Sequence, residues 1–385
     1  MKKSDFTKNS PGKIITTRKG YTAFIPNPLP PKVAWSNELL QALSRADRSL
    51  AKLAQVGNSF PVPQVVVRPF IRKEAVWSSQ IEGTRTSFQE LLSYEARQLS
   101  LFGDPQDAKE VHNYVKAINY GLECLNDLPM SSRLIREIHG VLMKGVRGET
   151  MTPGEFRKSQ NWIGQPGATI ENARYVPPPM DEMIACLSDL EKFIHKDSDL
   201  PPLLRIGLIH YQFEAIHPFL DGNGRIGRLL ITLLLVAWGL MAQPLLYLSN
   251  YIEANRRKYY QRLLAVSQKG AWEAWLLFFL EGVCSQAEDA SRRINKLQEL
   301  RTRYHKLVAK DRSHRKLERM IDYLIGTPIT SINQTRDILE IGSFTTIQRL
   351  IDKLCGVGIL KEITGNSRNR AFSAGEILRV LENQE

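Results

Sequence analysis

The sequence predicts a mainly α-helical protein with a small α+β domain at its C-terminal end. Three observations support this fold class. Apolar residues recur at spacings of three, four and seven through most of residues 36–308, which is the helical period. A stretch rich in glycine and proline interrupts that period at 147–180. After residue 313, short helical segments give way to β-prone ones.

The helical segments are separated by turn-forming residues. Residues 20–35 hold four prolines and are expected to be an extended lead-in. Within the glycine- and proline-rich stretch, Ala168–Val176 is the best candidate for a short β-hairpin. Helical periodicity covers 36–57, 70–100 with an interruption at Gly83, 108–125, 130–145, 181–196, 202–216, 225–240, 256–268 and 271–308.

The C-terminal segment has the order of a winged helix-turn-helix domain. Three helices are expected at 316–325, 332–339 and 345–354, followed by a strand at 359–363 and a second strand from Ala371. The third helix would be the recognition helix and 364–370 the wing tip. Residues placed to meet DNA are Thr345, Thr346, Gln348, Arg349, Arg368 and Arg370. Residues 313–385 carry ten Lys/Arg against nine Asp/Glu, which is less basic than is usual for nucleic-acid domains.

Length and composition limit the organisation and location of the chain. A length of 385 residues predicts three parts: an N-terminal helical region over 1–110, a central domain over 111–310 and the winged helix over 313–385. The net charge is +12, of which residues 1–20 contribute about +5, and we expect these to be a mobile tail. Four cysteines without a CxxC motif indicate reduced thiols. No apolar leader follows the first lysines, and the longest apolar run, 229–241, is too short to span a bilayer, so we expect a cytoplasmic protein.

The segment 217–228, HPFLDGNGRIGR, carries the residue types that phosphoryl-type transfer needs. Gly222–Gly224 can point successive amide N–H groups into one concavity at the start of a helix, which makes a phosphate cradle. Arg225 and Arg228 lie on one helical face and suit a polyphosphate. Asp221 can bind Mg²⁺. His217 can take a proton from an incoming hydroxyl.

This segment resembles the signature of the Fic family, His-Pro-Phe-x-(Asp/Glu)-Gly-Asn-Gly-Arg-x-x-Arg, with no departure. The resemblance covers roughly residues 30–300 and implies the compact helical Fic fold. Further segments that resemble the family are PGEFR at 153–157, QNWIG at 160–164, YVPPP at 175–179, LLYLS at 245–249 and the pair Tyr259–Tyr260.

The resemblance implies a role for each residue of the motif. It makes His217 the general base, Asp221 the Mg²⁺ ligand and Phe219 the anchor of the loop in the core. The flap, Thr169–Val176, would pair with an extended target segment by strand addition. The expected ATP-binding residues are Glu82, His217, Gly222, Asn223, Gly224, Arg225, Ile226, Gly227, Arg228, Asn255 and Tyr260.

An upstream segment resembles the family's inhibitory pattern, (Ser/Thr)-x-x-x-Glu-(Gly/Asn). Ser78 and Glu82 are four residues apart and share a helical face, and Gly83 would let that helix stop. The resemblance implies that Glu82 pairs with Arg228 and occupies the place of the γ-phosphate. ATP would then bind unproductively.

These features predict an auto-inhibited protein adenylyltransferase that moves AMP from ATP to a hydroxyl side chain. Gly224 favours attack at the α-phosphorus, because a relative with lysine there acts as a kinase-like phosphotransferase. Other donors, such as CDP-choline, stay open. The alternative function is a DNA-binding regulator with a nucleotide-sensing Fic domain. Expected partners are ATP and protein targets, with no membrane; DNA and a second copy of the chain remain open.

Overall fold

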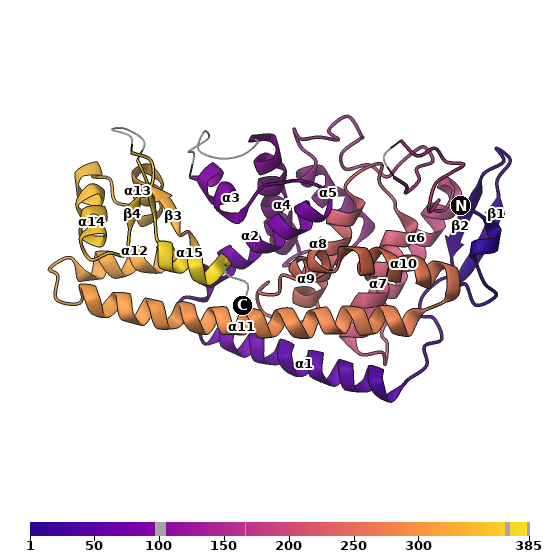
Figure 1. Ribbon diagram of the computed structural model, residues 1–385, viewed down its shortest axis with the longest axis horizontal. Helices are drawn as coiled ribbons and strands as arrows, with labels where there is room; N and C mark the ends of the chain where they lie inside the picture. Colours follow the sequence, from indigo (N-terminus) through magenta and orange to yellow (C-terminus); the bar gives the residue numbers. More distant parts are fainter. Residues whose placement is uncertain (97–104, 166, 366–369, 383–385) are drawn as a thin grey trace.

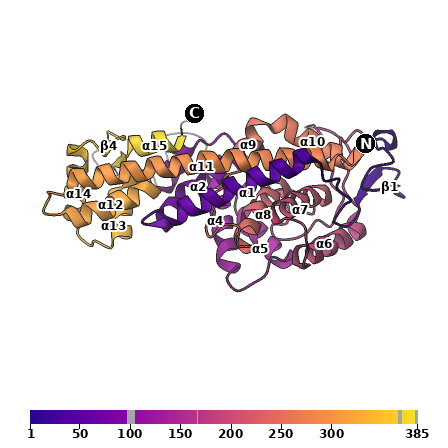
Figure 2. The same cartoon turned by 90° about the horizontal axis from the view of Figure 1, so that it is seen from below.

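The computed structural model describes residues 1–96, 105–165, 167–365 and 370–382, and most of them are helical (Figure 1). The long helix α11 (Trp272–Val308) runs along the length of the molecule, with α1 (Asn37–Asn58) beside it (Figure 2). The other helices before it are α2 (Pro63–Ile81), α3 (Phe88–Glu95), α4 (Pro105–Cys124), α5 (Ser132–Leu142), α6 (Met180–His195), α7 (Pro202–Ile216), α8 (Asn223–Ala237), α9 (Ser249–Ala254) and α10 (Arg256–Lys269). The predicted mainly helical fold is therefore confirmed.

Helices α7 and α8 form the centre of the apolar core. Nearly every side chain of both helices is buried, because the sequence here is apolar all round rather than along one stripe. The segment between them, residues 217–222, therefore starts and ends on rigid elements. Among the described residues, no helix has the length and apolar character needed to cross a membrane.

The N-terminal segment is ordered, so the prediction of a mobile tail over residues 1–20 is wrong. After the short helix η1 (Lys3–Asp5), strands β1 (Gly12–Thr16) and β2 (Thr22–Pro26) form an antiparallel hairpin in place of the expected lead-in. Phe6 stacks on Phe24 at 5.4 Å between ring centroids, and the Thr7 N–H donates to the Gln268 carbonyl at 2.8 Å. The alternating residues of IITTRKGYTAFI, with a glycine turn, were a strand signal that the basic charge obscured.

The C-terminal segment contains the predicted three helices and two strands, together with two unpredicted elements. In chain order these are α12 (His314–Gly326), β3 (Ile329–Ser331), α13 (Ile332–Leu339), α14 (Phe344–Gly356), β4 (Lys361–Glu362), β5 (Ala371–Ser373) and α15 (Gly375–Glu382). The strands form an antiparallel sheet in the order β3-β5-β4. Helix α15 was not expected, and it returns the chain to the side of α11 (Figure 1). The predicted domain boundaries and the winged-helix assignment stay predictions.

Two other elements differ from expectation. The single interrupted helix expected at 70–100 is the pair α2 and α3, and α2 starts earlier because Pro63 sits at its first turn, where proline is well tolerated. The hairpin expected within Ala168–Val176 takes another form. Among the described residues of 161–176, the one β-bridge joins Ile163 to Tyr175. Turns fill the interval, because Gly167 has φ +82° and the Thr169 N–H donates to Asn172 Oδ1 at 2.8 Å.

Candidate functional site

A cleft of about 1030 Å³ opens between the flap, the start of α8 and helix α10. Its lining includes six residues of the predicted site from well-separated parts of the sequence: Glu82, His217, Asp221, Gly224, Arg228 and Tyr260. Flap residues such as Asn172 and Tyr175 form the opposite wall. The structure thus brings the expected base, metal ligand, phosphate loop and inhibitory carboxylate together around one cavity.

The loop that begins at His217 has a backbone path that its sequence permits. His217 ends α7 in the left-handed region, at φ 50°, and Gly222 precedes α8 at φ +79°. Asn223 closes the loop: its Oδ1 accepts from the Phe219 N–H and its Nδ2 donates to the Phe219 carbonyl, both at 2.8 Å. The Asn223 side chain is therefore fully engaged in shaping the loop. A phosphate would meet the backbone N–H groups at the start of α8 instead.

Two polar side chains outside the motif, the buried Arg157 and the half-buried Asn161, bond to the backbone of the loop. The Arg157 guanidinium donates to the carbonyls of His217 at 3.0 Å and Pro178 at 2.5 Å. The Asn161 amide donates to the Phe219 carbonyl at 2.8 Å. Sequence analysis noted these two residues only as part of a family-like stretch. Both residues follow the turn at Gly154, and the sequence carries no signal that assigns them a role in holding the loop.

His217 is neutral at physiological pH. Burial and the nearby Arg157 guanidinium lower the pKa of His217 to about 4. A second histidine, His210, is buried about two turns earlier on α7. Its Nδ1–H donates to the Gly227 carbonyl at 2.9 Å and its Nε2 accepts from the Tyr259 hydroxyl. Both ring nitrogens of His210 therefore have partners that hold α8 and α10, whereas His217 lines the cleft.

Arg228 is buried and paired with the predicted inhibitory residues. Its Nε donates to Ser78 Oγ at 2.9 Å, and its second amino group donates to the Ser78 carbonyl at 2.8 Å and to Glu82 Oε1 at 2.7 Å. Burial would raise the pKa of Glu82, but the Arg228 charge outweighs it, so the pKa lies below its usual value. Glu82 ends α2, and Gly83 follows with φ +103°, which confirms the predicted helix stop.

Gly224 lies directly against this ion pair. A Cβ atom at this position would overlap Glu82 Oε1 and would approach an Arg228 amino nitrogen to 2.9 Å. A side chain at residue 224 would therefore compete with the Glu82 carboxylate for the same space. The absence of a side chain here is needed for the contact between Glu82 and Arg228 as well as for the cradle.

Several acidic groups surround the two arginines. Arg225 is buried, with Glu110 at 3.5 Å and Asp221 at 3.7 Å, so its charge is partly matched already. Glu214 lines the cleft near Arg228, and burial raises its pKa to about 7. Sequence analysis missed Glu214, whose signal is only a carboxylate placed three residues before His217 on an otherwise apolar helix.

Several predicted ATP-binding residues lie outside the cleft lining, among them Gly222, Asn223 and Arg225 of the motif. Ile226 is fully buried in the core, so it could meet a nucleotide only through its backbone. The Asn255 side chain donates to the Tyr251 carbonyl at 3.0 Å, between α9 and α10. Gly227 packs against Glu214. On α10, next to Asn255, the residues that line the cleft are Arg256 and Tyr260.

Asp221 fits the role of a magnesium ligand. Its side chain is 44% exposed and lines the cleft beside the cradle. Across the described residues, no group of three or more His, Cys, Asp or Glu side chains could hold a metal alone. Mg²⁺ is ordinarily held by one or two carboxylates together with substrate phosphates, so a single carboxylate matches a cation that arrives with the nucleotide.

Comparisons with known proteins agree with this geometry. Residues 40–123 match the Fic/DOC family N-terminal model, and residues 129–235 match the Fic/DOC family model. Over 208 residues the chain is 24% identical to a protein adenylyltransferase Fic of Drosophila erecta and 25% identical to that of Drosophila willistoni. These alignments cover 52% of this chain and 38% of each relative, so the chain spans well under half of the relatives it matches.

Solved structures share the fold. A Fic family protein from Desulfovibrio desulfuricans G20 has a TM-score of 0.59 at 17% identity, over 90% of this chain and 98% of that one. A fragment of Fic-1 from C. elegans has a TM-score of 0.51 at 20% identity, over 68% of this chain and 74% of that one. With both domain models matched in sequence order and the motif folded around the cleft, the chain carries a Fic/DOC family N-terminal domain at residues 40–123 and a Fic/DOC family domain at residues 129–235.

Proposed function

We propose that this chain is an auto-inhibited protein adenylyltransferase that transfers AMP from ATP to a hydroxyl side chain of a protein. One observation carries the proposal: a neutral histidine faces the same cleft as a glycine-rich helix start and a buried arginine that is already occupied by a carboxylate. The relatives' name, protein adenylyltransferase, supports the reaction class.

The chemistry follows from where the groups lie. His217 accepts the proton of a Ser, Thr or Tyr hydroxyl as the oxygen attacks the α-phosphorus of ATP. The bond from the α-phosphorus to the bridging oxygen breaks, and pyrophosphate leaves with its electron pair. The N–H groups at the start of α8 and the Arg225 and Arg228 guanidiniums stabilise the phosphate charge. Mg²⁺, when bound at Asp221, would neutralise phosphate oxygens and fix their geometry.

The contact between Glu82 and Arg228 is the proposed inhibitory device, or brake. Arg228 uses its Nε and one amino group on Ser78 and Glu82, so it has little capacity left for a γ-phosphate. Release requires the Glu82 side chain, which is about a third exposed, to leave the cleft. The unproductive state is therefore a property of one helix end rather than of the whole fold.

The test compares the wild-type chain with Glu82→Gly, using ATP labelled at the α- or the γ-phosphorus together with Mg²⁺. We expect α-label on protein, a mass gain of about 329 Da for AMP less water, and a strong rise in self-modification in Glu82→Gly. Ser78→Ala is the matched variant: it removes one hydroxyl partner of Arg228 and leaves the carboxylate, so the rise should be small. Label from the γ-phosphorus would indicate a phosphotransferase, and unchanged labelling in Glu82→Gly would contradict the brake.

A DNA-binding role for residues 313–385 stays a prediction from sequence. Thr345 and Arg349 are exposed on α14, but Gln348 bonds to Asp352 at 2.7 Å and Arg370 pairs with Glu362. Arg368 lies outside the described residues. A salt-dependent mobility shift with random duplex DNA would support the regulator alternative.

A further inference from the structure

His139, on α5, lies directly behind the loop that starts at His217. Its ring is 1% exposed in the core and stacks flat on Phe219, with 3.8 Å between ring centroids and 5° between the planes. Phe219 is fully buried between this ring and two other aromatic rings. His139 therefore touches the residue that anchors the loop.

Both ring nitrogens of His139 have a backbone partner. Nδ1 accepts the Gly154 N–H at 2.9 Å, so the ring proton lies on Nε2, which donates to the Asp221 carbonyl at 3.0 Å. The two partners fix one tautomer and one ring orientation. Gly222 lies against the same ring, since a Cβ atom there would be 3.3 Å from Nε2.

The Asp221 carboxylate has few restraints of its own. Its Oδ1 accepts the Gly222 N–H at 2.7 Å, and its Oδ2 is 3.7 Å from an Arg225 amino nitrogen. The Asp221 backbone, in contrast, is held at its carbonyl by the bond from His139 Nε2. We propose that His139 is a positioning residue that fixes the direction of the Asp221 carboxylate toward a divalent cation bound with the nucleotide phosphates. This inference rests on the proposed function.

The test uses His139→Gln and His139→Asn in the Glu82→Gly background. The glutamine amide can reach the Nε2 position and keep the bond to Asp221, whereas asparagine reaches only the Nδ1 position and keeps the bond to Gly154. Outer partners of metal ligands typically change metal affinity by about 10- to 100-fold. We expect His139→Asn to raise the Mg²⁺ concentration for half-maximal transfer by about that factor, with a smaller change in His139→Gln.

A second readout does not depend on transfer. Binding of Mn²⁺ in the presence of ATP, followed by electron paramagnetic resonance, should weaken in the same order. If both variants lower only the melting temperature and leave the Mg²⁺ and Mn²⁺ dependence unchanged, His139 is structural and the inference is wrong. If the Glu82→Gly parent attaches no AMP, the proposed function fails, while the Mn²⁺ series still decides the role of His139.

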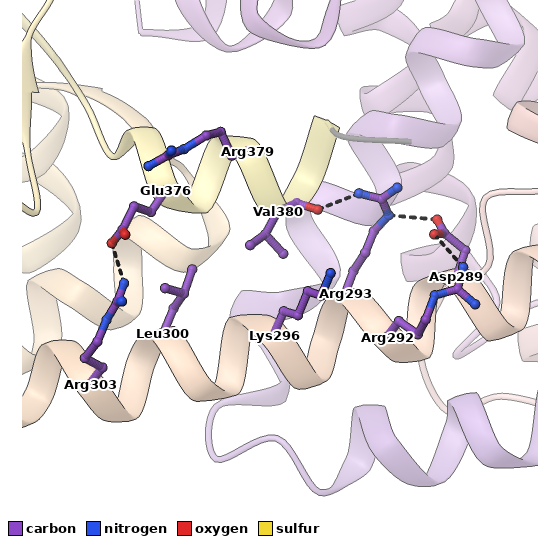
Figure 3. A pocket seen from close by; sticks show the side chains of 9 residues that line it. All are labelled: Asp289, Arg292, Arg293, Lys296, Leu300, Arg303, Glu376, Arg379 and Val380. Atoms are coloured by element: carbon purple, nitrogen blue, oxygen red, sulfur yellow. Dashed lines mark hydrogen bonds and ion pairs between the residues drawn. The ribbon is translucent and has the colours of Figure 1, made fainter. Parts of the chain in front are cut away.

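A separate observation concerns the C-terminal elements, which contact the helix that carries the brake. Lys73 lies midway along α2 and is 5% exposed; its Nζ donates to the Leu381 carbonyl at the end of α15 at 2.8 Å. The Arg293 guanidinium of α11 donates to the adjacent Val380 carbonyl at 2.5 Å (Figure 3). These cations bind carbonyls at the C-terminus of α15, where positive charge is favourable.

The brake segment, residues 78–83, is flanked on both sides by contacts with the C-terminal elements α12 and α15. Before it, the N-terminal half of α2 packs closely on α12, because a Cβ atom at Gly326 would be 2.6 Å from the Val65 carbonyl. After it, Gln89 of α3 donates to Glu382 at 2.7 Å. Lys73 precedes Ser78 by five residues, roughly 7.5 Å along the helix.

We infer that α12–α15 act on the brake: their contacts with α2 and α3 keep Glu82 on Arg228, and loss of these contacts releases Glu82. The test measures self-modification in Lys73→Met and in Gln89→Ala, alone and combined with Glu82→Gly. Gln89→Ala removes an exposed contact and should leave folding intact. We expect each single variant to raise labelling severalfold over the wild type and to add nothing to Glu82→Gly.

The combined variants separate this inference from its alternatives. A structural role for Lys73 or Gln89 would change labelling by the same factor with and without Glu82, which would overturn the inference. Unchanged labelling in both single variants would overturn it as well. If Glu82→Gly itself shows no AMP transfer, hydrogen exchange across residues 78–82 in the single variants reports whether the helix end has loosened.

Discussion

The two walls of the cleft are held in opposite ways. The loop wall, residues 217–228, is fixed by hydrogen bonds from the side chains of Asn223, Arg157 and Asn161. The flap wall, Thr169–Val176, is anchored only at its end, where Tyr175 and Val176 are buried and the Tyr175 hydroxyl donates to the Ala215 carbonyl at 2.8 Å. Its first half, residues 169–172, is mostly exposed and is held by a local turn. A preorganised wall suits charge that develops in a transition state, because the dipoles need no rearrangement. A loosely held wall suits an extended segment that adds by strand pairing.

The largest expected effect is at His217. His217→Ala removes the base from the loop wall and should lower transfer by about 10²- to 10⁴-fold, the usual contribution of a general base. Label incorporation from α-labelled ATP in the Glu82→Gly background measures it. The thermal unfolding midpoint should stay close to that of the parent, and persistent transfer by a folded variant would contradict the assigned base.

Asn223→Ala should break the rigidity of the loop wall. The Phe219 N–H would be left buried without a partner, which costs about 1–3 kcal/mol. The Phe219 carbonyl keeps the Asn161 amide, so only one group is orphaned. We expect this loss in the free energy of unfolding, measured with urea, and a larger relative loss of transfer.

Asn223→Asp distinguishes the two roles of this side chain. Aspartate can still accept the Phe219 N–H, but it has no N–H for the Phe219 carbonyl and would place a buried carboxylate oxygen against it. Its charge would also repel phosphates beside the start of α8. We therefore expect stability to fall at least as far as in Asn223→Ala and transfer to be lost, whereas recovery of stability would mean that only the bond from the Phe219 N–H matters.

The same contrast explains what the sequence could predict. The loop wall was predictable because chemistry and backbone geometry lie in one contiguous segment, and His217, Asp221, Gly224 and Arg228 do line the cleft. Glu82 was predictable as a partner of Arg228 only through resemblance. Distant supports such as His139 carry no local pattern, since a histidine on an apolar helix face reads as ordinary core.

The flap and the N-terminal strands were mispredicted for different reasons. The bridge between Ile163 and Tyr175 joins residues on either side of two glycines and a proline, so no alternating run predicts it. The β1–β2 hairpin lies in a basic segment that composition assigned to a tail. The bridge depends on a contact between distant residues, which periodicity does not encode, whereas the hairpin is local and its strand pattern was obscured by the basic charge.

The pH dependence of transfer tests whether His217 is held in its neutral form by the loop wall. A base acts in its neutral form, so a pKa lowered to about 4 keeps His217 active as pH falls, whereas an ordinary pKa of 6.5 would leave roughly one tenth neutral at pH 5.5. Glu82 raises this pKa, so Glu82→Gly lowers it further. With saturating ATP and Mg²⁺, we expect nearly equal rates at pH 5.5 and 7.5.

Glu214 needs a control in that experiment, since its raised pKa of about 7 falls within the range. The comparison is therefore made with Glu214→Gln present at both pH values. A drop of about tenfold at pH 5.5 in that variant would mean that His217 titrates as an exposed histidine.

The smallest expected effect is at the flap wall. Trp162→Phe keeps an aromatic ring but removes the indole N–H that donates to the Ala168 carbonyl at 2.8 Å. One neutral hydrogen bond near the surface contributes about 1 kcal/mol, or roughly fivefold. We expect KM for an extended peptide of alternating valine and threonine to rise by up to that factor. The KM for ATP should not change, because the substitution leaves the loop wall unaltered. An equal rise in both constants would mean that the two walls are not independent, and that the nucleotide also depends on the order of the flap.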